Sequence, residues 1–347
     1  MPYADSAFQF ERVDFTLLAW NDTVARFKDR TIFQTPAWLS FLTETQQAEP
    51  VFAMLRSGKD VCGYFSGLIV NKFGLKILGS PLPGWTTSYM GLNLLPGVPR
   101  RPVVDALMRF AFDELHCVHV EMMDRYVTIE DGKALGYEYT SLQGFEVDLT
   151  QTEDEVFSNM TSACRRCIRR ADKSGMTIEE AHDIGFADEY YEQLQEVFKK
   201  QSLVPTYGRD RVKALIRCVA APDQLLLVRA RNPEGRCIAT GIFPALNGTM
   251  YFWGGASRQA CLGSRPNEAI HWYAMRHWKR RGMCRYDMGG GGEYKRKYGG
   301  QEIRVPWLRK SKYPWIEALR GLAPHAIRWS QTLREKTARF ISRHGVP

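Results

Sequence analysis

The chain has 347 residues, a length that suits two domains better than one small module. Lysine and arginine outnumber aspartate and glutamate by 47 to 38, which gives a formal net charge of +9. Hydrophobic residues make up 44% and charged residues 24%, close to the globular average, which excludes a disordered or low-complexity chain. The composition therefore predicts two folded domains with an aromatic-rich core.

Three features favour a cytoplasmic protein. Residues 1–5 carry neither a basic flank nor an apolar run, so we expect no signal peptide. The most apolar stretch, residues 61–70, is shorter than the ~20 residues that a membrane-spanning helix needs. The eight cysteines are scattered, and a chain of this size needs no disulfide staples, which predicts reduced thiols.

Residues 309–347 are predicted to form a basic amphipathic tail. They hold nine Lys/Arg against two Glu, so most of the net charge lies there and the preceding chain is nearly balanced. Such a tail could contact an anionic membrane or RNA. It could equally pack on the body with its charged side in water. Peripheral contact with the inner membrane face is therefore one of several expectations.

Apolar periodicity predicts the elements of the first half. They are a strand at 8–15, helices at 19–27 and 37–44, strands at 51–56, 61–70 and 75–79, a helix at 103–115, a strand at 116–123, and a strand pair within 137–149.

The second half repeats this order. Its predicted elements are helices at 154–160 and 162–173, a strand at 176–180, helices at 187–200 and 209–219, strands at 225–231, 237–246 and 249–256, a helix at 267–281, and strands at 285–288 and 303–308. We therefore predict an α/β (α+β) protein with domains at 1–146 and 147–308. Each domain is expected to hold a mixed, mainly antiparallel sheet flanked by helices.

A glycine-rich loop offers the strongest signal of a functional site. Residues 286–300 read YDMGGGGEYKRKYGG, an apolar strand followed by four glycines and a short cationic, aromatic helix. Consecutive glycines let the backbone approach a ligand and direct its N–H groups at an anion or a developing oxyanion. No Gly-Lys-Ser/Thr follows, so the loop is not a P-loop. We favour a ligand site here over a flexible linker.

Arginines cluster at residues 162–171. In a helix, Arg165 and Arg169 share one face, an array that suits phosphate as well as it suits a solvated surface. The Cys164-x-x-Cys167 pair has no partner pair at zinc spacing, and the histidines do not cluster. We expect no metal site, and the sequence also lacks the common hydrolytic motifs.

These motifs, in this order, resemble the FemABX-type branch of the GNAT acyltransferase superfamily, which includes CelD-like proteins. The resemblance rests on segments 33–38, 164–175, 253–257, 266–267, 286–290 and 294–300. It implies two tandem GNAT-like domains. It also implies transfer of an acyl or aminoacyl group onto an amine.

The resemblance assigns two catalytic residues. Lys295 matches the family lysine that stabilises negative charge near the transferred group, and Asp287 is placed to orient the amine, take its proton, or hold the loop. The expected substrate-binding residues are Trp85, Tyr89, Arg165, Arg169, Tyr207, Arg209, Trp253, Ser257, Asn267, Gly289, Gly290, Tyr294 and Tyr298.

The donor and acceptor stay open. Ala260 and Ser264 depart from the usual acetyl-CoA motif, and residues 39–42 lack the lysine that binds a nucleotide diphosphate in bridge-forming enzymes. We expect no tightly bound cofactor and a donor that is aminoacyl-tRNA or an acyl thioester of CoA or a carrier protein. The expected acceptor is an amine on a peptidoglycan or exopolysaccharide precursor. The alternatives are an N-acyltransferase acting on a small amine or amino sugar, and a non-catalytic RNA- or membrane-binding module.

Overall fold

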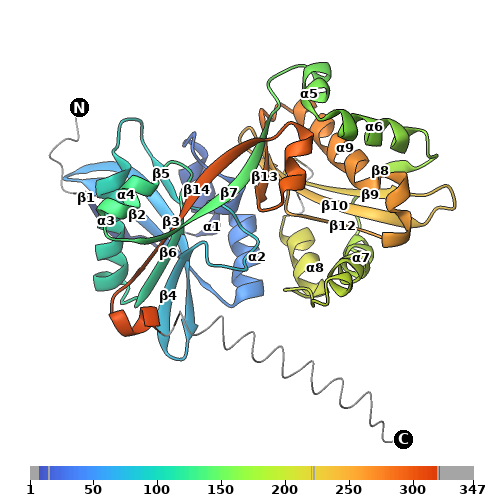
Figure 1. Ribbon diagram of the computed structural model, residues 1–347. Coiled ribbons are helices and arrows are strands. Elements are labelled where there is room, and N and C mark those ends of the chain that lie inside the picture. The colour runs from blue at the N-terminus through green and yellow to red at the C-terminus, as the bar shows by residue number, and fades with distance from the viewer. Residues whose placement is uncertain (1–7, 15, 220, 222, 319, 321–347) are drawn as a thin grey trace, which may run out of the picture.

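The computed structural model describes residues 8–14, 16–219, 221, 223–318 and 320. Two lobes of sheet and helices lie side by side (Figure 1), and their strands join in one 14-stranded sheet. The predicted α/β fold with a mainly antiparallel sheet is therefore confirmed.

The first lobe is built on four antiparallel strands that form a meander, and one later strand joins the sheet in the parallel direction. Its strands are β1 (Phe8–Arg12), β2 (Glu49–Ser57), β3 (Asp60–Lys72), β4 (Leu75–Ser80), β5 (Leu92–Leu94) and β6 (His119–Met123). Its helices are α1 (Leu17–Ala25), the 3₁₀ turn η1 (Ile32–Gln34), α2 (Pro36–Gln46), α3 (Arg100–Arg109), the π-helical turn η2 (Phe110–Glu114) and α4 (Ile129–Ala134). Helix α2 starts where the sequence favours it, because Thr35 caps the Trp38 N–H and Pro36 occupies the first turn.

The second lobe repeats the scheme with longer helices. Its helices are α5 (Glu153–Asn159), α6 (Ser162–Asp172), α7 (Phe186–Lys200), α8 (Arg209–Cys218) and α9 (Pro266–Arg280), with 3₁₀ turns η3 (Gln259–Ser264) and η4 (Glu293–Tyr298). Its strands are β8 (Thr177–Ala181), β9 (Leu225–Arg231), β10 (Cys237–Leu246), β11 (Thr249–Tyr251), β12 (Gly254–Ser257) and β13 (Arg285–Gly290).

Two long strands connect the lobes: β7 (Glu138–Asp148) and β14 (Gln301–Ser311). The sheet runs in the order β1-β2-β3-β4-β6-β14-β7-β13-β11-β10-β9-β8, so the last strand lies between β6 and β7. β14 pairs with β6 through residues 307–311 and with β7 through residues 301–309. The predicted domain limits at 146 and 308 both fall inside these strands, and the predicted tail begins within β14.

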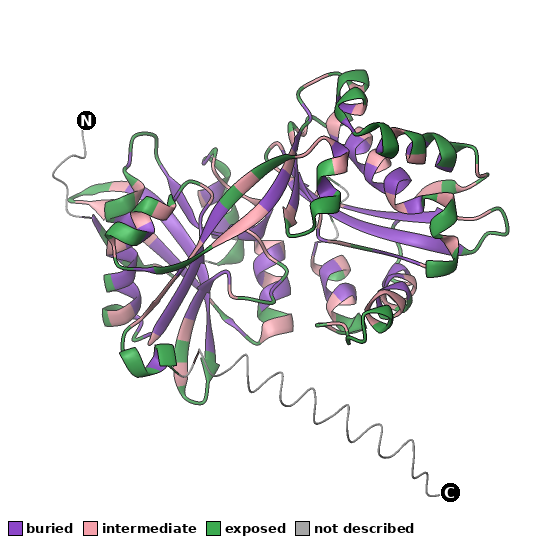
Figure 2. Cartoon of the chain, in the orientation of Figure 1, coloured by how far each residue is buried: buried purple, intermediate pink, exposed green. Residues whose placement is uncertain are grey.

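An apolar cluster packs the two lobes together. Aromatic side chains from η1 and α2 meet β11 and the residues after it, with the Phe33 and Tyr251 ring centroids 4.7 Å apart and those of Phe41 and Trp253 6.5 Å apart. Separate clusters fill the first lobe under α3 and the second lobe under α6 and α9. Figure 2 shows the central strands of both lobes buried.

Several predicted elements need correction. Residues 137–149 form one strand, β7, rather than a pair, because neighbouring strands bind both of its edges. The predicted strand at 249–256 is broken after Tyr251 into β11 and β12. The predicted helix at 103–115 begins at Arg100 and gives way at residue 110 to the π-helical turn. The short elements β5 and α4 were not predicted, because three and six residues hold too little periodicity.

Candidate active site

The candidate site lies where two central strands of the second lobe diverge. β11 and β13 run parallel with Tyr251 opposite Asp287, and the Phe252 N–H still donates to the Asp287 carbonyl at 2.9 Å. β12 then turns to pair with β10, with Gly254 opposite Ile242. One edge of β12 is therefore left unpaired in the described part of the chain, and cavities open on both sides of Phe252.

The first cavity, here called the Lys295 cavity, has a volume of about 270 Å³. Its walls come from both lobes: Phe33, Thr86, Thr87 and Ser88 of the first, and Tyr251, Phe252, Trp253, Asp287, Met288, Gly289, Gly290 and Lys295 of the second. Five of the residues predicted from the sequence therefore meet here.

Asp287 is buried in the wall of this cavity. Its Oδ1 accepts a 2.7 Å hydrogen bond from the Gly289 N–H, and its Oδ2 lies 3.9 Å from the Arg125 guanidinium. Burial first, and then the charge of Glu146 on the neighbouring strand, raise the pKa of Asp287 to about 6. The Gly289 N–H, Arg125 and Tyr89 act against this rise. Asp287 is therefore a carboxylate at neutral pH that accepts a proton more readily than an exposed aspartate.

Lys295 is a buried cation on η4 that is held against the strand of Asp287. Its Nζ donates to the carbonyl oxygens of Met288 at 2.6 Å and Gly290 at 2.9 Å. Two of the three ammonium protons are therefore occupied, and the third has no acceptor in the described part of the chain. Burial lowers the pKa of Lys295 to about 8, against the effect of Asp287.

The glycine run shapes the loop between these two residues. Gly289, Gly291 and Gly292 have φ values of 70°, 72° and 79°, a region that favours glycine. This backbone turns back on itself within a few residues, which brings Lys295 onto Met288 and Gly290. The run therefore serves as a tight turn that positions the cation.

The second cavity, here called the Ser257 cavity, has a volume of about 210 Å³. It lies between β12 and the start of α9, where the Asn267 Nδ2 donates to the Ser257 Oγ at 3.1 Å. Tyr294 and Tyr298 also line it, so four further predicted residues meet here. His271, which the sequence did not single out, lines the cavity as a neutral ring, because burial and then Lys297 and Lys295 lower its pKa to about 3.

Six predicted substrate-binding residues line neither cavity. One of them, Tyr89, is buried in the apolar cluster between the lobes and interacts with Asp287. Arg165 donates to the carbonyl of Met160 at 2.6 Å and to that of Ser158, while Arg169 packs on the Phe157 ring. Arg209 pairs with Asp188 at 3.1 Å, and the Tyr207 hydroxyl bonds to that of Tyr190 at 2.7 Å. Trp85 is buried in the apolar cluster between the lobes, next to the residues 86–88 that do line the Lys295 cavity.

Two residues beside Asp287 escaped the sequence reasoning. Arg125 follows β6 in the first lobe and forms a bidentate ion pair with Glu146 of β7. Glu146 lies opposite Asp287 in the register of β7 and β13. Only the pairing of strands from distant parts of the chain brings these charges together.

Comparison with known proteins supports the predicted resemblance. Residues 158–297 match the family model described as an acetyltransferase (GNAT) domain. No curated protein matches the sequence. The match covers both cavity-forming segments of the second lobe, 252–257 and 287–295.

Solved structures share the fold at low sequence identity. FemX aligns with a TM-score of 0.69 and 12% identity, covering 86% of this chain and 97% of FemX. A tandem GNAT protein from the clavulanic acid biosynthesis pathway aligns with a TM-score of 0.55 and 11% identity, covering 88% and 99%. L-PGS from Bacillus licheniformis aligns with a TM-score of 0.50 and 13% identity, covering 84% and 95%. The predicted tandem GNAT fold is confirmed, and a GNAT domain on this fold supports an acyltransferase.

Proposed function

We propose that the protein transfers an activated acyl or aminoacyl group onto an amine. The amine acceptor binds in the Lys295 cavity and the acyl donor in the Ser257 cavity. One observation carries this proposal. The carboxylate of Asp287 and the ammonium group of Lys295 line the Lys295 cavity together, at the point where β11 and β13 diverge. The Ser257 cavity adjoins it there, because Phe252 lines both.

The chemistry requires a neutral amine and stabilisation of a tetrahedral oxyanion. With a pKa of about 6, Asp287 is ionised at neutral pH and takes a proton from the attacking amine. The amine nitrogen forms a C–N bond with the donor carbonyl, and the C–O or C–S bond to the donor breaks. The remaining N–H of Lys295 stabilises the oxyanion, and the proton that the amine has lost passes to the leaving alkoxide or thiolate.

The Ser257 cavity favours an acyl thioester as the donor. The unpaired edge of β12 offers backbone groups to an extended arm, and the N-terminus of α9 adds a favourable dipole for anionic groups. A GNAT fold typically uses acyl-CoA, which is consistent with this choice. Aminoacyl-tRNA stays the competing donor, because Ala260 and Ser264 on η3 depart from the usual acetyl-CoA motif.

The proposed acceptor is an amine of a cell-envelope precursor. FemX shares the fold, as does the C-terminal domain of a putative lysylphosphatidylglycerol synthetase from Agrobacterium fabrum. Lysylphosphatidylglycerol consists of an amino acid joined to a membrane lipid. In the described residues no helix has the length and apolar character to cross a membrane. We propose that the protein acts in the cytoplasm and contacts the anionic membrane face peripherally through residues 309–347.

Transfer assays test this function. Purified protein is incubated with labelled acyl-CoA or labelled aminoacyl-tRNA, together with amine-bearing envelope precursors or amino sugars, and products are identified by mass spectrometry. The Lys295→Ala variant serves as the reference with strongly reduced activity. Transfer from either donor that needs Lys295 supports the proposal and identifies the donor. No transfer from any donor, with intact binding of RNA or vesicles, would show a non-catalytic module instead.

A further inference from the structure

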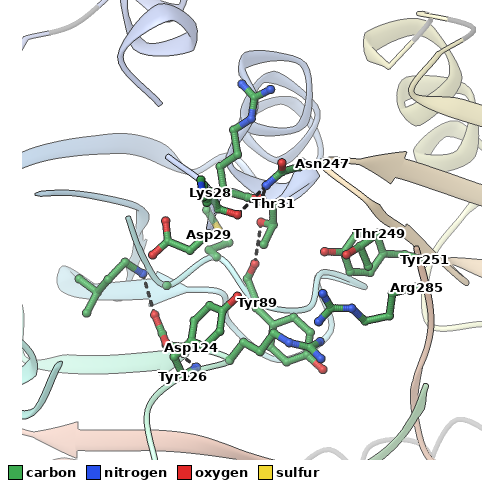
Figure 3. A pocket seen from close by; sticks show the side chains of 15 residues that line it. Lys28, Asp29, Thr31, Tyr89, Asp124, Tyr126, Asn247, Thr249, Tyr251 and Arg285 are labelled. Atoms are coloured by element: carbon green, nitrogen blue, oxygen red, sulfur yellow. Dashed lines mark hydrogen bonds between the residues drawn. The ribbon is translucent and has the colours of Figure 1, made fainter. Parts of the chain in front are cut away.

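A third cavity lies between the lobes, on the side of Tyr251 away from the glycine loop, and the proposed chemistry does not use it. Its walls come from residues 28–31 and 89–92, from residues 124–126 after β6, and from Asn247, Thr249, Tyr251 and Arg285. Figure 3 shows Arg285 pointing toward the middle of this cavity, with Thr249 and Tyr251 beside it. We call it the Arg285 pocket.

Hydrogen bonds between distant segments fix the walls of the pocket. The Asn247 Nδ2 donates to the carbonyls of Lys28 at 2.8 Å and Arg30 at 3.0 Å, which ties the two lobes together here. The Thr31 Oγ1 donates to the Tyr89 carbonyl at 2.9 Å. The pocket is therefore built before any ligand arrives.

The pocket carries positive charge that the protein itself does not neutralise. Its two carboxylates, Asp29 and Asp124, both pair with Arg100, at 2.7 and 2.6 Å. Arg125 pairs with Glu146. Arg285 has no carboxylate partner among the described residues.

Within the described part of the chain, Arg285 lacks an ion-pair partner even though the residue opposite it on the neighbouring strand is an aspartate. Asp148 of β7 faces Arg285 in the strand register. Its oxygens instead accept from Thr150 N at 2.8 Å, Thr150 Oγ1 at 2.6 Å and Gln151 Nε2 at 3.4 Å. The guanidinium, which is partly buried, is thus left free for another anion, and partial burial strengthens charge-assisted hydrogen bonds.

The position of Arg285 relates this pocket to the reaction. Arg285 and Asp287 point to the same face of β13, two residues apart, which places them about 7 Å from each other along the strand. Tyr251 lines both the Arg285 pocket and the Lys295 cavity. A molecule whose amine lies at Asp287 could therefore place a group at Arg285 only a few bonds away.

The size of the pocket limits that group. Its volume is about 50 Å³, which holds a few water molecules at about 10–15 Å³ each. A carboxylate or a phosphate fits this space, whereas a sugar ring or a base does not. Arg285, Tyr251 and Thr249 supply donors of the kind that such an oxyanion binds.

We propose that the Arg285 pocket binds an anionic group, a carboxylate or a phosphate, carried by the amine acceptor. The acceptor would then be an amine with an oxyanion about 7 Å from the reacting nitrogen. The identification of the ligand as the acceptor rests on the proposed function, whereas the anion site itself does not.

Calorimetric titration of the full chain with inorganic phosphate and with acetate, without an acyl donor, tests the site. Four proteins are compared: the wild type, Arg285→Gln, Arg285→Lys, and Arg304→Gln as a matched control. Arg304 is an exposed arginine of β14 that pairs with Glu302 at 2.7 Å, outside all the cavities described. Circular dichroism and thermal melting check that each variant is folded.

We expect saturable binding to the wild type and to Arg304→Gln. Arg285→Gln should bind at least about tenfold more weakly, as expected for the loss of a charge-assisted hydrogen bond, and Arg285→Lys should fall between them. If Arg285→Gln does not fold, Arg285→Lys carries the comparison, because it keeps the charge and loses the planar fork. Tighter binding of phosphate than of acetate would indicate a phosphate-bearing acceptor, and the reverse a carboxylate.

Equal anion binding by the wild type and by the folded Arg285 variant, or no saturable binding by the wild type, would overturn the anion site. Because no acyl donor is present, this result leaves the proposed transfer untouched. Conversely, anion binding without any transfer activity would reject the proposed function and keep the site.

Discussion

Lys295 combines burial with two backbone acceptors, an arrangement that holds its ammonium group in one position. Removing the side chain would leave the carbonyls of Met288 and Gly290 without their donor, but both lie beside a cavity that water can enter. The structural cost of the change should therefore be smaller than its effect on the reaction.

Lys295→Ala should lower kcat by a factor on the order of 10²–10³, the usual effect of losing one preorganised oxyanion donor. Lys279→Ala is the matched control, because the Lys279 Nζ also donates to a backbone carbonyl, that of Leu149 at 2.7 Å, away from the cavities. Steady-state kinetics and thermal melting of both variants provide the comparison. Near-normal turnover of Lys295→Ala would remove this residue from the mechanism.

The pH dependence of kcat/KM should be bell-shaped. Asp287 must be ionised to accept a proton, so activity should fall as the pH drops below about 6. Lys295 must be protonated to stabilise the oxyanion, so activity should also fall above about 8. Lys295→Arg, which stays charged, should shift only the alkaline limb. An alkaline limb that Lys295→Arg leaves unchanged would assign that limb to another group.

Asp287→Asn should stabilise the protein at pH 8 while it reduces activity. The folded pKa of Asp287 is raised above that of an unfolded aspartate, so its ionised form opposes folding above about pH 6, and this penalty is gone below the unfolded pKa. The gain should be about 1–3 kcal/mol. Thermal melting at pH 8 and at pH 4 measures it.

Asp148→Asn is the control, because it should destabilise the protein at pH 8, where Asp287→Asn stabilises it. Hydrogen bonds from the Thr150 side chain and N–H lower the pKa of Asp148, so its ionised form supports folding at pH 8, and this support is lost as the pH falls through the folded pKa. If both variants change the melting temperature in the same direction at pH 8, the assigned environment of Asp287 is wrong.

The residues of the candidate site were predictable to different extents. Lys295, Asp287, Gly289 and Gly290 stand close together in one glycine-rich segment, so local sequence was sufficient to find them. Arg125, Glu146 and Arg285 acquire their roles from strand pairing across the lobes. A sequence pattern carries no information on such a register.

At the scale of elements, the approach of β10 to α9 fixes one wall of the Ser257 cavity. Gly241 lies opposite Gly255 of β12, and a Cβ at position 241 would fall 2.6 Å from the Phe243 ring and 2.7 Å from a methyl group of Ile270. Only glycine lets the strand and the helix pack this closely.

Gly241→Ala should therefore lower the free energy of unfolding by about 1–3 kcal/mol, the typical cost of overpacking. Gly263→Ala is the matched control, since nothing lies within 4 Å of a Cβ at that position. Chemical denaturation of both variants measures the difference. Equal stability of the two variants would show that β10 and α9 can move apart freely.

Most helices and strands followed from apolar periodicity, as for α7, α9, β9 and β10. The break between β11 and β12 did not. Residues 249–256 were predicted as one strand because they are rich in apolar and aromatic residues. The chain leaves β13 at Phe252 because β12 pairs with β10 instead. Competition between two partner strands is a property of the assembled sheet, so the two glycines indicated a bulge or splay here but not which strand β12 would pair with.

At the scale of the whole molecule, aromatic and basic side chains gather at the free end of the first lobe. Tyr313 and Trp315 stack with their centroids 6.2 Å apart and remain 43% and 51% exposed. Phe73, at the tip of the β3–β4 hairpin, is fully exposed. The backbone of Val118 links Lys76 and Lys312, because its N–H donates to the Lys76 carbonyl and its carbonyl accepts from the Lys312 N–H, both at 2.9 Å. Figure 1 shows the β3–β4 hairpin and the segment after β14 at the same end of the lobe. Such a surface suits an anionic bilayer.

Of the predicted basic tail, the structure describes only the first part, which contributes Lys312, Tyr313 and Trp315 to this surface. The Lys312 Nζ donates to the Phe112 carbonyl at 2.8 Å, Ile316 is buried, and Arg320 lies 3.5 Å from Glu138, so these three residues contact the body. Residues 321–347, which hold the remaining five basic residues of the tail, lie outside the described part of the chain.

A chain ending at residue 320 should keep the melting temperature and kcat of the full chain. It should bind phosphatidylglycerol vesicles more weakly at low salt, with a difference that shrinks as salt rises, because screening weakens charge attraction. Vesicle co-sedimentation at two salt concentrations and thermal melting measure both. Early melting together with salt-independent binding would show instead that residues 321–347 pack on the body.

The position of β14 has a consequence for synthesis. The ribosome releases β6 and β7 long before residues 301–311, yet these two strands are not neighbours in the finished sheet, because β14 lies between them. The first lobe therefore emerges with a gap between β6 and β7 that β14 fills later. The nascent protein must protect the exposed edges of β6 and β7 until residues 301–311 have been synthesised, so the two lobes are completed together rather than one after the other.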